Sequence, residues 1–110
     1  MSTVSTHILD TGVGRPARGV TVHLAARGGR AADWRALGSA TTDADGRCRD
    51  LPAVPAGTAH VRLDFAVEAY FAERPAFFPE VTVTFAVVPG EHHHVPLLLS
   101  PFGYSVYRGS

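Results

Sequence analysis

The sequence contains no lysine, only one cysteine and no long apolar run, and the scarcity of each feature excludes a class of protein. All ten basic side chains are arginines scattered along the chain, and ten acidic residues balance them, so nothing favours binding to nucleic acid or an anionic membrane. Cys48 has no partner for a disulfide within the chain, and the N-terminus lacks the features of a secretion signal. No window approaches the roughly 18 apolar residues of a membrane span. We therefore expect a soluble, cytoplasmic protein.

The composition that remains is typical of one small globular domain. The chain has 110 residues, which is enough to bury a single core, so we expect one domain over residues 1–110. An apolar fraction of 45%, together with 11 glycines and 8 prolines, indicates a folded chain with many turns. A disordered chain would be less apolar.

Apolar and polar residues alternate with a period of two over much of the chain, which predicts β-strands with one buried face. Three segments show this most clearly: Val20–Leu24, Val61–Phe65 and Val81–Val87. Residues 66–74 instead show helical spacing, with Asp64 as the expected N-cap and Pro75 as the residue that ends the helix. We therefore predict an all-β protein, an antiparallel β-sandwich of seven or eight strands with one short helix.

Two of the predicted strands differ from the others because both of their faces are partly apolar. In the first strand, Ser5, His7 and Leu9 lie opposite the face that we assign to the core. In the strand that begins at His94, the corresponding outward face carries His94 and Leu98. Each outward face thus presents a histidine beside a leucine. This composition indicates a surface that is buried where subunits meet.

Several segments resemble known functional motifs, but none has the required context. The glycines of Gly12–Ala17 fit a dinucleotide fingerprint, yet a strand follows them instead of a helix. The turn Thr41–Gly46 starts like a calcium-binding loop, but its twelfth position is Pro52, where such a loop needs glutamate. No Gly-x-Ser-x-Gly segment is present, and Cys48 has no neighbouring base in the sequence. Covalent catalysis therefore has no obvious nucleophile.

The run His92-His93-His94 is the most unusual feature of the chain. On a strand, His92 and His94 point to one side and His93 to the other. Three interpretations stay open: a zinc site with His7 as a further ligand, a pair for acid–base catalysis near neutral pH, or a polar strand end without a role. Arg47 follows an Asp-Gly turn and could hold an anionic substrate beside these histidines.

The C-terminal segment is unusually aromatic for a chain end. Chain ends are usually polar and frayed, whereas residues 101–110 carry three aromatic side chains. Such a segment is held against the rest of the fold, and its terminal carboxylate could reach a site. A last strand that only completes a sheet is the alternative explanation.

Three segments resemble the 5-hydroxyisourate hydrolase family, which consists of transthyretin-related proteins. They are the N-terminal Ser5–Asp10, the turn Thr42–Arg47 and the C-terminal His94–Ser110. The resemblance extends over nearly the whole chain, and the ending Tyr-Arg-Gly-Ser is its most specific part. It implies a transthyretin-like sandwich of two four-stranded sheets with a short helix. It also implies a homotetramer, a dimer of dimers, with active sites in a channel where the dimers meet.

The resemblance also implies which residues form the site. Three positions match the family's catalytic residues: His7, Arg47 and His94. Four C-terminal positions match residues that bind the substrate: Tyr107, Arg108, Gly109 and Ser110. Two further positions are expected to support the site: His92 and Leu98. The one departure is His93, where the family commonly has tyrosine, and because His93 should point away from His94 we expect a small effect.

The reaction implied by the resemblance is hydrolysis of 5-hydroxyisourate to 2-oxo-4-hydroxy-4-carboxy-5-ureidoimidazoline in urate degradation, without a metal or an organic cofactor. As a hypothesis, Arg47 binds the substrate, His7 takes a proton from water, and His94 orients that water or protonates the departing nitrogen. One alternative is a transthyretin-like carrier that uses the same channel and needs no proton-transfer pair. A zinc-binding module built on His92 and His94 is another.

Overall fold

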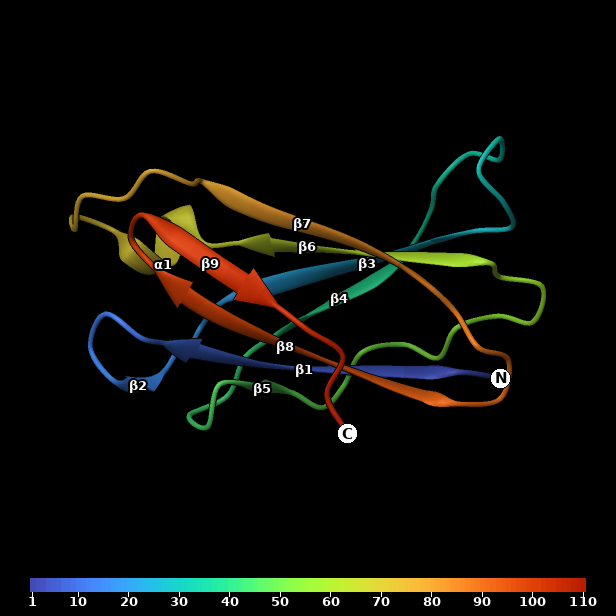
Figure 1. Ribbon diagram of the computed structural model, residues 1–110, viewed down its shortest axis with the longest axis horizontal. Coiled ribbons are helices and arrows are strands. Elements are labelled where there is room, and N and C mark those ends of the chain that lie inside the picture. The colour runs from blue at the N-terminus through green and yellow to red at the C-terminus, as the bar shows by residue number, and fades with distance from the viewer.

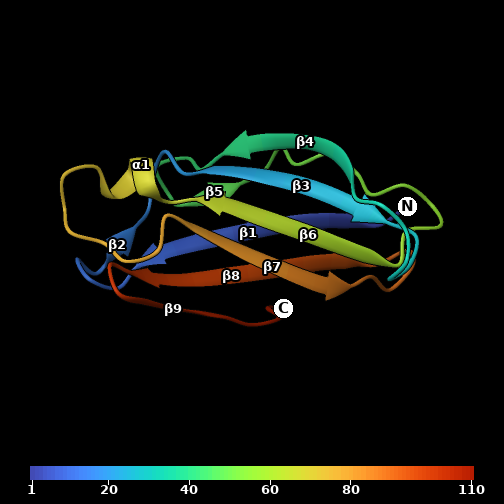
Figure 2. The same cartoon turned by 90° about the horizontal axis from the view of Figure 1, so that it is seen from above.

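Residues 1–110 form two β-sheets that stack face to face, with one short helix at one end of the stack, in the computed structural model (Figures 1 and 2). One sheet consists of five strands: β1 (Thr3–Asp10), β2 (Arg15–Pro16), β5 (Arg47–Cys48), β8 (His92–Ser100) and β9 (Gly103–Val106). The other consists of four strands in the order β4-β3-β6-β7: β3 (Thr21–Arg27), β4 (Arg35–Thr41), β6 (His60–Ala66) and β7 (Glu80–Ala86).

The predicted all-β sandwich of two sheets with one short helix is confirmed, with two differences in the first sheet. Its main path is β2-β1-β8-β9, and β5 is a fifth strand because β5 and β2 pair with successive parts of β1. In addition, β1 and β8 are parallel, while every other strand pair is antiparallel. Parallel neighbours need a long connection, and the whole second sheet lies between these two strands in the sequence.

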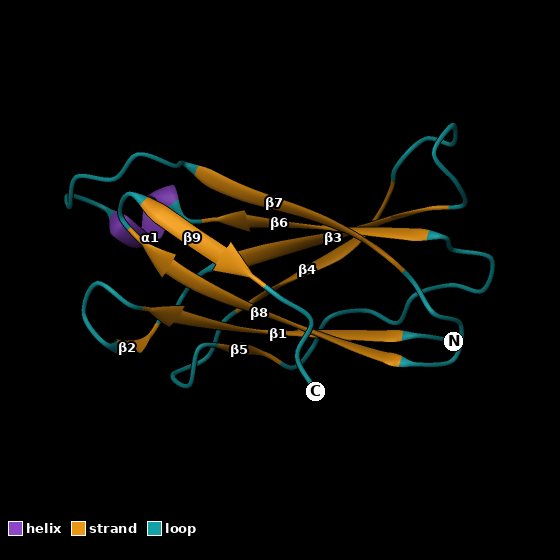
Figure 3. Ribbon diagram, in the orientation of Figure 1, coloured by secondary structure: helices purple, strands orange, loops and turns teal.

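The core lies between the two sheets, whose strands are orange in Figure 3, and it is built by the alternating residues that the sequence analysis selected. Val22, Leu63 and Phe65 have no more than a trace of exposed surface, and in β1 and β8 the same holds for Ile8 and Leu97. The alternation is less complete in β7, where Val81 is buried but the later apolar residues are only half-buried. The faces predicted for the core are therefore the faces that form it.

The helix α1 spans only Glu68–Phe71, so the prediction of a helix over residues 66–74 was too long. The predicted N-cap at Asp64 was wrong, because β6 continues through Asp64 to Ala66, which pairs with strands on both sides. The N-cap is Val67, which makes no side-chain capping hydrogen bond. Pairing within the sheet thus overrides the local helical pattern. No helix in the structure is long and apolar enough to cross a membrane.

A buried carboxylate fastens the helix region to the first sheet. The side chain of Asp10 is fully buried at the end of β1, and it accepts hydrogen bonds from the Tyr70 hydroxyl at 2.7 Å and from Arg74 Nη2 at 3.0 Å. The backbone N–H of Gly12 donates a third, at 2.9 Å. Burial alone would raise the pKa of Asp10, but the hydrogen bonds from Tyr70 and Arg74 outweigh it, and the pKa lies below its usual value.

Replacing Tyr70 by phenylalanine should lower the free energy of unfolding by about 1–3 kcal/mol, because a buried carboxylate loses a donor. Urea denaturation at pH 7 measures the difference. Since the pKa of Asp10 is lowered by folding, its contribution is present at neutral pH and is lost as the pH falls through the folded-state value. Tyr104→Phe is the matched control, because Tyr104 is 44% exposed and makes no side-chain hydrogen bond. Equal stabilities of the two variants would contradict this assignment.

Candidate active site

The three predicted catalytic residues project from the outward face of the first sheet. In the strand pairing, His7 of β1 lies opposite Arg47 of β5, and Ser5 of β1 lies opposite His94 of β8. Paired residues in a sheet point to the same face, and so do residues two positions apart on one strand. The strand β1 thus has Arg47 on its neighbour to one side and His94 on its neighbour to the other. Both lie close to His7 of β1 itself.

An open pocket of about 370 Å³ lies on this face. Eight residues line it: Ser5, Thr6, Arg47, Cys48, Arg49, His92, His94 and Ser110. Arg47, His94, His92 and Ser110 were predicted from the sequence. His7 was predicted too, but it borders Arg47 without lining the pocket, and its Nε2 lies 2.8 Å from the carbonyl oxygen of Asp45.

A tight turn before β5 fixes the position of Arg47. The carboxylate of Asp43 accepts hydrogen bonds from the backbone N–H groups of Asp45 and Arg47, at 2.9 and 3.0 Å. These bonds, that of Arg47 first, and the nearby Arg49 guanidinium lower the pKa of Asp43. Gly46 has a φ of 76°, and its carbonyl accepts a 2.7 Å hydrogen bond from Ile8 N–H. The Asp-x-x-Gly sequence therefore holds Arg47 against β1.

The imidazole of His94 is held through only one of its ring nitrogens. Its Nδ1 lies 2.8 Å from the Ser5 hydroxyl, while Nε2 makes no hydrogen bond within the chain. Burial lowers the pKa of His94, and the nearby Arg47 guanidinium lowers it further. His94 is therefore neutral at pH 7, and it can accept a proton from a molecule in the pocket.

His7 is held in a complementary way. A carbonyl oxygen only accepts, so the 2.8 Å contact with Asp45 requires that Nε2 of His7 carries a proton. In the neutral ring this leaves Nδ1 as an acceptor. His7 and His94 therefore each have one ring nitrogen committed to the protein and one that is available.

Of the four predicted C-terminal residues, Ser110 lines this pocket and Gly109 packs against His94. The N–H of Gly109 donates a 2.8 Å hydrogen bond to the carbonyl of His94. A Cβ at Gly109 would lie 2.7 Å from Cδ2 of His94 and 3.0 Å from Cγ of Pro96, so only glycine lets the segment lie this close. Ser110 then reaches the pocket wall.

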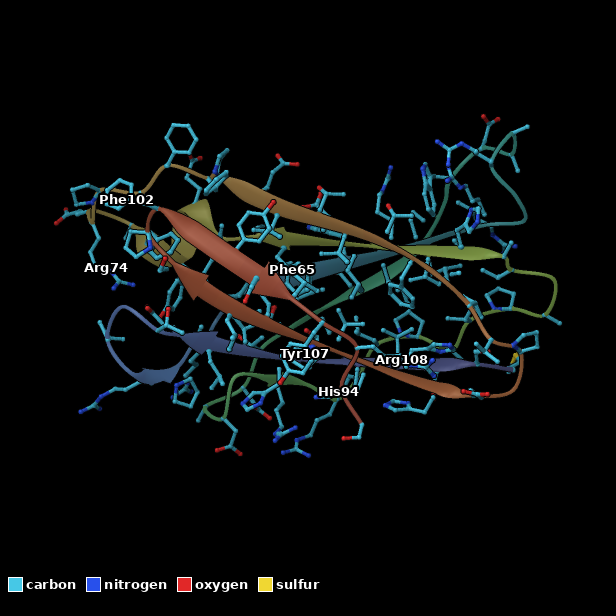
Figure 4. The ribbon with its side chains drawn as sticks, in the orientation of Figure 1. Phe65, Arg74, His94, Phe102, Tyr107 and Arg108 are labelled. Atoms are coloured by element: carbon cyan, nitrogen blue, oxygen red, sulfur yellow. The ribbon has the colours of Figure 1, made fainter.

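The other two C-terminal residues lie elsewhere in the single chain. Tyr107 and Arg108 line a second, mainly apolar pocket of about 130 Å³ beside β7, and the guanidinium of Arg108 pairs with Glu91 at 3.0 Å. His94 is also a wall of that second pocket. Figure 4 shows His94, Tyr107 and Arg108 around the C-terminal segment, far from the end of the sandwich that carries Arg74.

The predicted supporting residues differ in their distance from the pocket. His92 lines it, and both of its ring nitrogens make hydrogen bonds, to Thr3 and Ser5. Leu98 shares the same outward face, opposite Leu9, but lies outside the pocket. Both leucines are half-buried in the single chain.

The expectation that His93 points away from His94 is confirmed. His93 is 3% exposed, and its Nε2 accepts a 3.0 Å hydrogen bond from the N–H of Val88. The ring lies near Phe85, with 5.7 Å between the centroids. Its Nδ1 has no hydrogen-bond partner. The presence of histidine instead of the family's tyrosine at position 93 therefore changes the inner side of the sheet, away from the pocket.

Two further observations concern the alternative chemistries. Cys48 is buried, and burial, followed by the charges of Asp43 and Asp50, raises the pKa of its thiol to about 11. A thiol in this state is a poor nucleophile. No group of three or more His, Cys, Asp or Glu side chains is arranged to hold a metal ion.

The sequence analysis assigned no role to three side chains that belong to this site. Ser5 was placed on the outward face but given no contact, while Thr3 and Arg49 were not considered. The available signal was position: Thr3 and Ser5 precede His7 at intervals of two, which puts all three on one face of the strand. Their partners on β8 depend on the register of a distant strand.

A two-sheet sandwich with histidines and an arginine gathered on the outward face of one sheet defines a transthyretin-like protein with a polar pocket suited to acid–base catalysis. The chain belongs to the HIUase/Transthyretin family, whose model matches residues 4–109.

Similar proteins include both members named as enzymes and members named as transthyretins. A 5-hydroxyisourate hydrolase of Caulobacter vibrioides is 43% identical, and the alignment covers 100% of both chains. The structure of the Klebsiella pneumoniae 5-hydroxyisourate hydrolase has a TM-score of 0.82 and 38% identity, covering 98% of this chain and 99% of that one. Sea bream transthyretin in complex with thyroxine has a TM-score of 0.85 but 28% identity, covering 96% and 93%.

Proposed function

We propose that this chain hydrolyses 5-hydroxyisourate in urate degradation by acid–base catalysis in the pocket between β5 and β8. The chain is an enzyme of the 5-hydroxyisourate hydrolase kind, and its full-length likeness to proteins of that name supports the substrate. The observation that carries the chemistry is the neutral His94, whose unpaired Nε2 shares a pocket with the Arg47 guanidinium.

The proposed mechanism starts with a water molecule between the two histidines. Arg47 binds the anionic or carbonyl edge of the substrate, which stabilises the negative charge that develops on attack. Nε2 of His94 takes the proton as the water oxygen adds to the ring carbonyl, and Nδ1 of His7 accepts a hydrogen bond that orients the water. The bond between that carbon and the ring nitrogen then breaks, and His94 returns the proton to the nitrogen.

This assignment moves the general-base role from His7, where the sequence-based hypothesis placed it, to His94, which keeps its role as proton donor to the departing nitrogen. His94 lines the pocket, whereas His7 lies beside it with one nitrogen committed to the Asp45 carbonyl. The C-terminal residues are proposed to close the pocket around the substrate. Ser110 does so in the single chain, and Tyr107 and Arg108 would do so from the neighbouring pocket, which shares His94.

We further propose a cytoplasmic homotetramer in which a second copy covers this face. The pocket is open in the single chain, and the half-buried pair Leu9 and Leu98 continues the same face as an apolar surface. Covering it would exclude water and strengthen the interaction of Arg47 with an anion. A lone, buried Cys48 needs no oxidising compartment.

A small-molecule carrier is the second candidate, because the chain has the fold of a transthyretin that was solved with thyroxine. The identity to that protein is lower, 28% against 43% for the named hydrolase. A carrier also has no use for a neutral histidine with an unpaired nitrogen beside an arginine. These observations favour hydrolysis.

The test is to generate 5-hydroxyisourate from urate in the cuvette and to follow its ultraviolet absorbance. We expect the purified chain to accelerate the decay well beyond that in buffer, and to sediment as a tetramer. A variant that ends at Val106 should keep the wild-type circular dichroism and lose turnover. Decay equal to that in buffer, combined with tight thyroxine binding, would replace the enzyme by the carrier.

A further inference from the structure

Four polar side chains form a continuous line from the surface of the molecule to the pocket. The hydroxyl of Thr3 lies 2.6 Å from Nδ1 of His92, and Nε2 of His92 lies 2.8 Å from the hydroxyl of Ser5. That hydroxyl lies 2.8 Å from Nδ1 of His94. Thr3 and His92 are exposed, while Ser5 and His94 are half-buried. The line therefore joins solvent to the imidazole at the pocket.

The single hydrogen of the Ser5 hydroxyl couples the two imidazoles. If Ser5 donates to His92, its oxygen accepts from Nδ1 of His94, and Nε2 of His94 is then an unprotonated acceptor. If Ser5 donates to His94, its oxygen accepts from Nε2 of His92, and Nε2 of His94 then carries the proton. Both arrangements satisfy every hydrogen bond in the line. The orientation of one hydroxyl thus decides whether His94 presents a base or an acid to the pocket.

We propose that Ser5 is a positioning residue that sets the tautomer of His94, and that Ser5, His92 and Thr3 relay a proton between His94 and solvent. The inference rests on the proposed function, because it concerns the proton that His94 takes from water and the proton that it gives to the departing nitrogen. It adds to that mechanism a route by which His94 is discharged and recharged during one turnover.

The relay moves protons only. When Nε2 of His94 has taken a proton from water, Nδ1 passes its proton to the Ser5 oxygen, and the Ser5 hydroxyl hydrogen moves to Nε2 of His92. Nδ1 of His92 then releases its proton through Thr3 to solvent. The reverse sequence returns a proton from solvent as His94 gives its own to the departing nitrogen. One proton leaves and one enters, so the turnover is balanced.

The charges around His94 explain why a proton path through Ser5 would be useful. Burial, which has the largest effect, and then Arg47, His7 and His92 disfavour a second proton on the His94 imidazole, while Arg49 and the chain-terminal Ser110 line the same pocket. A doubly protonated His94 ring is therefore unfavourable, and it persists only until one of its two protons moves elsewhere. The exit through Ser5 ends at exposed side chains, where water accepts the proton.

Ser5→Ala tests the proposal, because it removes the hydroxyl and leaves both imidazoles in place. We expect kcat for 5-hydroxyisourate to fall about 10–100-fold, the range for residues that orient a functional histidine, with KM within about twofold of the wild type. Ser5→Thr keeps the hydroxyl and should recover most of the rate. Ser39→Ala is the matched control, because Ser39 lies on an exposed position of β4 in the other sheet.

The second measurement is the ¹⁵N NMR spectrum of the histidine rings, which reports the tautomer without any substrate. Ser5→Ala should change the ¹⁵N shifts of both His92 and His94, whereas Ser39→Ala should change neither. An unchanged kcat in Ser5→Ala would overturn the proposal, and so would a lower kcat with unchanged His94 shifts. If the wild type fails to hydrolyse 5-hydroxyisourate, the proposed function fails, and the ¹⁵N comparison alone decides whether the coupled line of hydrogen bonds exists.

Discussion

Replacing His94 by alanine should reduce kcat for 5-hydroxyisourate by about 10²–10⁴-fold, which is the usual contribution of a general acid–base group. The variant loses the only imidazole nitrogen at the pocket that has no partner in the protein. The fold should persist, because His94 is half-buried on an outward face and the core residues on either side of it are untouched. Absorbance decay of substrate generated from urate, with circular dichroism as a check on folding, measures both effects.

The pH dependence gives a second readout of the same residue. Because burial and the nearby positive charges lower the pKa of His94, the base stays available below the pH at which an ordinary histidine becomes protonated. The wild-type kcat/KM should therefore fall only as the pH drops through this lowered value, and the residual rate of His94→Ala should lack that step. His23→Ala, which removes an exposed histidine from β3, should match the wild type. A His94→Ala rate within twofold of wild type would exclude His94 as the catalytic group.

Replacing Gly46 by alanine should have the largest effect on stability. The φ of 76° costs an alanine about 1–2 kcal/mol. The new Cβ would also clash with the carbonyl oxygen of Ile8, so the turn must move away from β1, at a further cost on the order of 1–3 kcal/mol. Because Arg47 follows directly, we also expect kcat/KM to fall.

Gly57→Ala separates the two causes. Gly57 has a φ of 85° but no atom within 4 Å of an added Cβ, so this variant carries the conformational cost without the clash. Urea denaturation should give a larger loss for Gly46→Ala than for Gly57→Ala, and only the former should impair turnover. Equal losses would show that the close contact with Ile8 relaxes without cost.

The strands were predictable because each buries one face, and burial of one face requires apolar and polar residues to alternate with a period of two. Val22, Leu63 and Phe65 could be assigned to the core on this ground alone. The helix could not be bounded in the same way. Residues 64–66 have an acceptable helical pattern, but the ladders with β3 and β7 provide more hydrogen bonds than one helical turn, so the strand continues.

The residues of the candidate site could be named from the sequence, but the hydrogen bonds and ion pairs between them could not. Family resemblance named His7, Arg47 and His94, and parity along β1 and β8 placed the two histidines on outward faces. The line through Ser5 required the register in which Ser5 meets His94, and at a sequence separation of 89 positions there is no local signal of it. Likewise, the ion pair that draws Arg108 to Glu91 depends on the path of the C-terminal segment, which no periodic pattern describes.

The parallel pairing of β1 with β8 has a consequence for synthesis. The pocket combines Ser5 and Thr6, residues 47–49 and, near the end of the chain, His92, His94 and Ser110, so a nascent chain cannot assemble it before its last strands have left the ribosome. Contacts this distant in sequence also make folding slow, since a long loop must close before they form. The edge of β1 that pairs with β8 therefore stays unpaired until β8 emerges, and an unpaired strand edge is open to mispairing with other chains.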